Sequence, residues 1–134
     1  MRRYSIVLTL STLIALAATA AAPRTPPKPE SGVKVEKIVV ATGVTNLEPV
    51  GEGSEFPASA GTVYCWTKVS TASVPATIKH LWYLGDKKVF EFPLDLKFNS
   101  TRTWSRKSIK PGDWRVDVTD EAGNVLSSIS FTVK

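Results

Sequence analysis

Apolar and polar residues alternate along most of the chain that follows residue 32. Residues 114–118 are the clearest case, with Trp114, Val116 and Val118 predicted to face inward. The same period of two, or a β-branched run, marks the other predicted strands, which are 33–42, 62–69, 77–84, 87–92, 101–109 and 125–133. The pattern predicts an all-β domain of about seven strands, in the form of an immunoglobulin-like antiparallel β-sandwich.

Turn residues separate the predicted strands. Gly85-Asp86 predicts a hairpin, and Pro93 is expected to end the strand that starts at Lys87, because proline cannot donate to the ladder. Residues 46–60 hold Gly, Pro and Ser and are expected to form a loop. The three glutamates of that segment match no calcium-binding spacing.

The first 20 residues have the order of a secretory signal. Arg2 and Arg3 precede an uncharged apolar run, and Ala18-Thr19-Ala20 is an A-x-A cleavage site. The run is short for a membrane span and no charged flank follows it, so we expect cleavage and no stable membrane insertion afterwards. The predicted organisation is a signal peptide at 1–20, a disordered proline-rich leader at 21–32 and the sandwich at 33–134, exported to the periplasm or the extracellular space.

Charge and cysteine content narrow the function classes. The formal net charge is +5, and removal of Arg2 and Arg3 with the signal leaves 15 basic against 12 acidic residues, a net charge of +3. This mild excess does not argue for nucleic acid as a partner. The lone Cys65 cannot form an internal disulfide, and its apolar neighbours predict burial. One histidine and one cysteine do not make up a metal site, so we expect no metal and no cofactor.

No set of residues predicts catalysis. His80 is the only histidine, and no oriented nucleophile or convergent carboxylate pair accompanies it, so we predict no catalytic residues and a protein that is not an enzyme. A packed, hydrogen-bonded imidazole is the simplest interpretation of His80, and a ligand-binding group beside Trp82 is the other. Trp104 shares one strand face with Arg102 and Arg106, which is typical of a binding surface. Core packing of Trp104 beneath an ordinary charged strand edge is the alternative. The candidate ligand-binding residues are Arg102, Trp104, Arg106, His80 and Trp82.

Five short blocks follow one another in a fixed order. They are Glu48-Pro49-Val50, Val63-Tyr64-Cys65-Trp66, His80-Leu81-Trp82-Tyr83 with Gly85, Arg102-Thr103-Trp104-Ser105, and Gly112-Asp113-Trp114-Arg115-Val116 with Gly123-Asn124-Val125-Leu126. In this order and spacing, over roughly residues 33–133, the chain resembles the bacterial family known as domain of unknown function 2914. The resemblance implies an exported or membrane-tethered β-domain with no assigned activity. Position 65 departs from the family, in which an aromatic residue is expected more often than cysteine.

Together these features predict a non-catalytic binding or assembly module of the bacterial cell envelope. Its expected partners are envelope proteins or a second copy of itself. The alternative is a carbohydrate-binding module, which needs at least two coplanar exposed aromatic side chains. The solvent exposure of Trp66, Trp82 and Trp104 discriminates between the two hypotheses.

The mature protein should begin at Ala21, because the A-x-A site ends at Ala20. Intact-mass measurement of the protein recovered outside the cytoplasm tests this. A mass that retains residues 1–20 would contradict the predicted cleavage.

Overall fold

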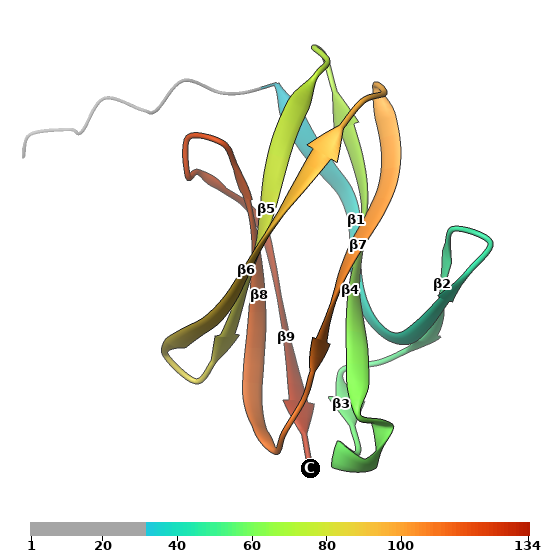
Figure 1. Cartoon of the computed structure of the whole chain (residues 1–134), viewed down its shortest axis with the longest axis vertical. Helices are drawn as coiled ribbons and strands as arrows, with labels where there is room; N and C mark the ends of the chain where they lie inside the picture. Colours follow the sequence, from blue (N-terminus) through green and yellow to red (C-terminus); the bar gives the residue numbers. More distant parts are fainter. Residues whose placement is uncertain (1–31) are drawn as a thin grey trace, which may run out of the picture.

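The structure is a computed structural model that describes residues 32–134, so the predicted signal peptide and residues 21–31 of the leader lie outside the described part. The described residues form nine strands and one short 3₁₀ helix, Ala58–Ala60 (Figure 1). The strands are β1 (Val33–Thr45), β2 (Glu48–Glu52), β3 (Glu55–Phe56), β4 (Thr62–Thr71), β5 (Ala76–Leu84), β6 (Lys87–Leu96), β7 (Ser100–Ser108), β8 (Gly112–Asp120) and β9 (Val125–Val133).

The strands build two sheets that pack as a sandwich (Figure 1). Sheet A has the order β2-β1-β4-β7, and sheet B has the order β3-β9-β8-β5-β6. Every pairing is antiparallel except that of β3 with β9, which is parallel. The predicted all-β antiparallel sandwich is confirmed, with nine strands in the described part rather than about seven.

The two additional strands come from residues 46–60, for which the prediction of a loop was wrong. Asn46 and Leu47 both have positive φ, 52° and 66°, which turns the chain tightly from β1 into β2. Two successive residues of this kind give a hairpin turn whose twist matches that of its strands. An Asn-Gly pair would have predicted such a turn from the sequence, whereas the Asn-Leu pair found here does not.

Pro93 does not end its strand, contrary to the prediction, because β6 continues to Leu96 with Pro93 opposite Lys79. β6 is the edge strand of sheet B. An edge strand has one side without a partner strand, so a residue that lacks an N–H is tolerated there. The same proline would have interrupted a central strand.

Aromatic rings fill the space between the sheets. Trp114 stacks on Phe131, with ring centroids 5.9 Å apart, and meets the edge of Trp82 at 6.5 Å. Trp82 and Cys65 are fully buried, and burial raises the pKa of the Cys65 thiol. The predicted inward direction of Trp114 and the predicted burial of Cys65 are both confirmed.

A buried hydrogen-bond network joins the two sheets through His80. His80 Nδ1 lies 2.7 Å from Ser105 Oγ, and Nε2 lies 3.3 Å from Thr67 Oγ1. Trp82 Nε1 donates to Ser105 Oγ at 3.0 Å, and Thr67 Oγ1 donates to the Thr103 carbonyl at 3.0 Å. His80 and Trp82 belong to β5, Thr67 belongs to β4, and Thr103 and Ser105 belong to β7. The network therefore holds β5 of sheet B against β4 and β7 of sheet A.

Counting donors assigns the protons of this network. Thr67 donates its only hydroxyl proton to the Thr103 carbonyl, so its oxygen accepts from His80 Nε2–H. Ser105 Oγ receives the indole N–H of Trp82 and gives its own proton to His80 Nδ1. His80 is thus a neutral imidazole with its proton on Nε2, and burial lowers its pKa to about 4.

Trp114→Ala should lower the free energy of unfolding by about 3–5 kcal/mol, because it removes a large ring from the core. The stacking on Phe131 and the hydrogen bond from Trp114 Nε1 to the Lys110 carbonyl are both lost. Chemical denaturation measures the change, with Trp104→Ala, on the half-buried outer side, as the smaller-effect control. A loss under about 1 kcal/mol for Trp114→Ala would contradict its place in the core.

Acid should destabilise the fold through His80. Its pKa is about 4 in the folded protein against 6.5 ordinarily, so the unfolded chain binds the proton first as the pH falls. Stability from this group is fully present above pH 6.5 and is lost between pH 6.5 and about 4. The loss amounts to roughly 3 kcal/mol.

Urea unfolding at steps across this pH range measures the effect. His80→Gln, which cannot titrate, is the control and should lose less stability over the same range. Because the chain has one histidine, the difference between the two proteins isolates His80. Equal pH dependence of both proteins would contradict the buried neutral imidazole.

Candidate functional site

Arg102, Trp104 and Arg106 project from the outer side of β7, away from the core. The alternate residue Ser105 is buried in the network between the sheets, which fixes the direction of its neighbours. Trp104 is half-buried, and the two arginines are exposed. The three predicted residues therefore share one face, and the alternative in which Trp104 packs in the core is excluded.

β4 extends this face with a second row of aromatic and basic side chains. Tyr64 lies opposite Arg106, Trp66 opposite Trp104, and Lys68 opposite Arg102. The period-two alternation of the sequence places Tyr64, Trp66 and Lys68 on one side of their strand, and the structure confirms it. The outer face of sheet A is therefore mixed aromatic and basic.

The β1–β2 hairpin curls over part of this face. Trp66 Nε1 donates to the Leu47 carbonyl at 2.9 Å, and Lys37 Nζ lies 5.9 Å from the centroid of the Trp66 ring. Trp66 is consequently only 2% exposed although it points away from the core. Sequence reasoning missed this cover because the hairpin was expected to be a loop.

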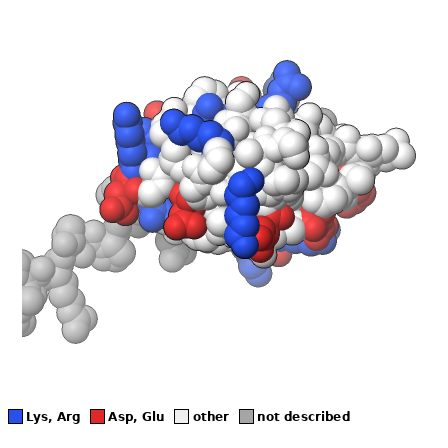
Figure 2. All heavy atoms as spheres, turned by 90° about the horizontal axis from the view of Figure 1, so that it is seen from below, with Lys and Arg blue, Asp and Glu red and all other residues white. Residues whose placement is uncertain are grey.

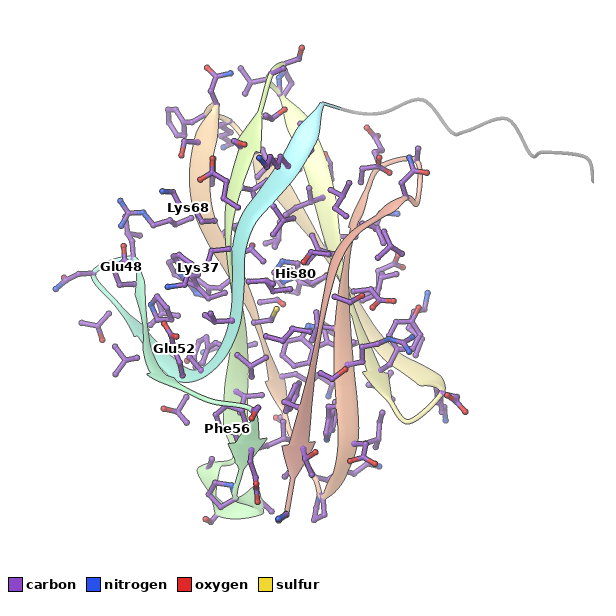
Figure 3. The ribbon with its side chains drawn as sticks, turned by 180° about the vertical axis from the view of Figure 1, so that it is seen from behind. Lys37, Glu48, Glu52, Phe56, Lys68 and His80 are labelled. Carbon is purple, nitrogen blue, oxygen red and sulfur yellow. The ribbon has the colours of Figure 1, made fainter. Side chains whose placement is uncertain are left out.

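Each acidic residue of the hairpin pairs with a cation. Glu48 forms an ion pair with Arg102, and Glu52 Oε1 lies 3.8 Å from Lys37 Nζ. Figure 3 shows Glu48 and Glu52 on the hairpin, with Lys37 and Lys68 on the side of sheet A that it approaches. Within residues 32–134 no cluster of His, Cys, Asp or Glu is suited to a metal ion. The glutamates of this segment act here as ion-pair partners of the face.

An open hollow lies between the hairpin and the end of β7. It has a volume of about 450 Å³ and is lined by Val44, Tyr64, Phe92, Trp104, Ser105 and Arg106, which we call the β7 hollow. Among the ion pairs of the described residues none includes Arg106. Phe92 comes from β6 of the other sheet and is 37% exposed. The hollow thus combines exposed apolar surface with an arginine that lacks a carboxylate partner in this part of the chain.

Sequence reasoning missed Val44, Tyr64 and Phe92 as members of the site. The outward direction of Tyr64 follows from the alternation of β4, so that residue could have been found. Val44 lines the hollow because the β1–β2 hairpin curls over the sheet, and Phe92 lines it because the edges of the two sheets meet there. No local sequence pattern predicts either arrangement.

His80 and Trp82 do not belong to this surface. Both side chains are fully buried, and Figure 3 shows His80 between the two sheets. Their hydrogen bonds to Ser105 and Thr67 account for their polar atoms. Neither side chain is accessible to a ligand in this structure, which agrees with the packed, hydrogen-bonded interpretation of His80. Strand alternation could not reveal this, because the inward face is also where a cleft would lie.

Basic and acidic side chains are interspersed over the end of the sandwich seen in Figure 2. On this side of the molecule the basic side chains therefore form no continuous positive surface. The part of the chain that the structure describes contains no helix of the length and apolarity needed to cross a membrane.

Comparison with known proteins gives one family. The model of DUF2914, described as a protein of unknown function, matches residues 75–133. No curated protein matches the chain. The matched region holds the last three of the five sequence blocks, from His80 onward, whereas the first two blocks precede it. The resemblance is thus confirmed over residues 75–133, where the chain matches the DUF2914 family.

Proposed function

We propose that this protein is a non-catalytic binding module of the bacterial cell envelope, exported by its N-terminal signal, and that it binds protein partners through the outer face of sheet A. The observation that carries the proposal is the β7 hollow, in which Trp104 and Arg106 stand beside an unpaired strand edge. Tryptophan and arginine are the residue types in which binding energy is most often concentrated. Export rests on the sequence of residues 1–20 alone.

Binding is a better explanation of this surface than catalysis. A nucleophile and a base must meet at an accessible point, and both Cys65 and His80 are buried. Burial also raises the pKa of the Cys65 thiol and so disfavours the reactive thiolate. The accessible residues of the hollow can form hydrogen bonds, ion pairs and apolar contacts, which are the elements of recognition.

The carbohydrate-binding hypothesis is less well supported. It needs at least two coplanar exposed aromatic side chains, and Trp66 and Trp82 are 2% and 0% exposed. Trp104, the remaining member of the set, is half-buried at the hollow. Of these three tryptophans only Trp104 is accessible, so the set does not supply the two exposed rings that the hypothesis needs.

Arg102→Ala combined with Arg106→Ala should reduce partner capture from an envelope extract by about tenfold or more, because both cations of the β7 face are removed. The matched control is Lys79→Ala with Lys88→Ala, which removes two positive charges near Glu91 in sheet B. The control should capture normally, and the melting temperature of both variants should stay near that of the parent. Capture that survives the arginine pair would place the binding surface elsewhere, with residues 46–60 as the next segment to test.

A further inference from the structure

We propose that β7 accepts an extended acidic segment of another protein as an added strand, which seats a carboxylate on Arg106 and an apolar side chain in the β7 hollow. This inference rests on the proposed binding function and names the class of partner. It follows from three features of β7, which are its free edge, its unpaired arginine and the apolar rings beside it.

The edge of β7 is open to strand addition. Within the described residues β7 pairs with β4 on one side and with no strand on the other. In an antiparallel strand alternate residues direct their N–H and C=O groups away from the existing partner. These unpaired groups over the nine residues of β7 are a template for a further strand. A peptide satisfies them, whereas a lipid or a sugar does not.

The outer side of β7 selects negative charge. Glu48 of the hairpin already pairs with Arg102, which shows that this face accepts a carboxylate beside Trp104. Arg106 lies four residues beyond Arg102 on the same face and pairs with no carboxylate of residues 32–134. An acidic side chain on the added strand would therefore complete the pattern that Glu48 begins.

The inner side of an added strand would meet apolar rings. Phe90 and Phe92 of β6 are 38% and 37% exposed, and their ring centroids lie 5.9 Å apart. Lys107 Nζ on β7 lies 5.8 Å from the centroid of the Phe90 ring, so these rings border the free edge of β7. Side chains of a strand alternate between its two faces. The expected partner segment is thus apolar on one face and carries acidic residues on the other.

A second copy of this chain is a poorer occupant. Antiparallel pairing of two β7 edges centred on Trp104 would place Arg102 of one copy opposite Arg106 of the other, and like charges opposite one another destabilise a sheet. The leader at 21–32 is also a poor match, because it carries Arg24 and Lys28 against one acidic residue, Glu30. Its four prolines lack the N–H groups that a strand needs.

The test measures binding of fluorescent nonapeptides to the full chain by anisotropy. The probe has Glu at alternate positions and Val or Phe between them, and a second peptide has Lys in place of every Glu. We expect the acidic peptide to bind at least about tenfold more tightly, with an affinity that falls as salt rises. Equal binding of the two peptides, or no binding of the acidic one at millimolar concentration, would overturn the proposal.

Two further versions of the acidic peptide test strand addition itself. One is N-methylated at the odd positions and the other at the even positions, which blocks opposite edges of the peptide. One version should lose binding and the other should retain it, because only alternate N–H groups face β7. Binding that tolerates both patterns would show that charge alone holds the peptide and would overturn the added strand.

Two protein variants locate the peptide and act in opposite directions. Arg106→Ala should weaken binding about tenfold, with Lys79→Ala in sheet B as its control. Glu48→Gln frees Arg102 for the peptide and should tighten binding about threefold, a gain that a misfolded variant cannot produce. Glu91→Gln, which removes the same charge from sheet B, should leave binding unchanged.

An unchanged affinity in both Arg106→Ala and Glu48→Gln would overturn the assignment to β7. If the peptides fail to bind while the paired Arg102 and Arg106 substitutions still abolish partner capture, this inference falls and the proposed function stands. If both fail, the outer face of sheet A is not a binding surface.

Discussion

The hydrogen bonds of Ser105 fix the face on which the candidate site lies. Ser105 accepts from Trp82 and donates to His80, both on the opposite sheet, and this holds its side chain inside the sandwich. Because a strand alternates its side chains, Trp104 and Arg106 must then point outward. A shift of β7 by one residue would bury Trp104 and an arginine and would leave His80 Nδ1 and Trp82 Nε1 without partners, at a cost of several kcal/mol. The core network and the surface site are therefore set by one register.

This dependence explains how far the sequence predicts the structure. Where apolar residues occupy the inward positions, as in Trp114, Val116 and Val118, alternation predicts burial correctly. On β7 the inward positions are polar, and Trp104 is the one large apolar side chain, so hydrophobicity alone favours the wrong face. The outward direction of Trp104 follows only from the hydrogen bond between Ser105 and His80, two residues that lie 25 positions apart along the chain. Local pattern contains no information on such a contact.

The β1–β2 hairpin changes what the face can do. Without its curl, Trp66 and Trp104 would lie side by side on an open sheet, which is the arrangement a carbohydrate platform needs. The carbonyl of Leu47 accepts a hydrogen bond from the indole N–H of Trp66, and the carboxylate of Glu48 forms an ion pair with Arg102. The hairpin therefore covers the part of the face around these two residues. The other part, around Arg106, stays open as the hollow. A leucine with positive φ at the turn makes this geometry, and residues of that conformation are rarely recognised in a sequence.

The basic side chains of β7 have two effects on its free edge, which are protection against unspecific pairing and selectivity for an acidic strand. A free strand edge invites pairing with any extended chain, and basic side chains are a common defence against it. The same side chains also make the edge selective, since they oppose a second copy of β7 and attract a strand of opposite charge. Proline within β6 protects the neighbouring edge by a different means, the removal of a backbone donor, which selects nothing. Of the two edges that meet at the β7 hollow, β7 therefore retains its full backbone hydrogen-bonding capacity and also carries basic side chains. This difference favours β7 over β6 as the edge for the strand addition that we propose.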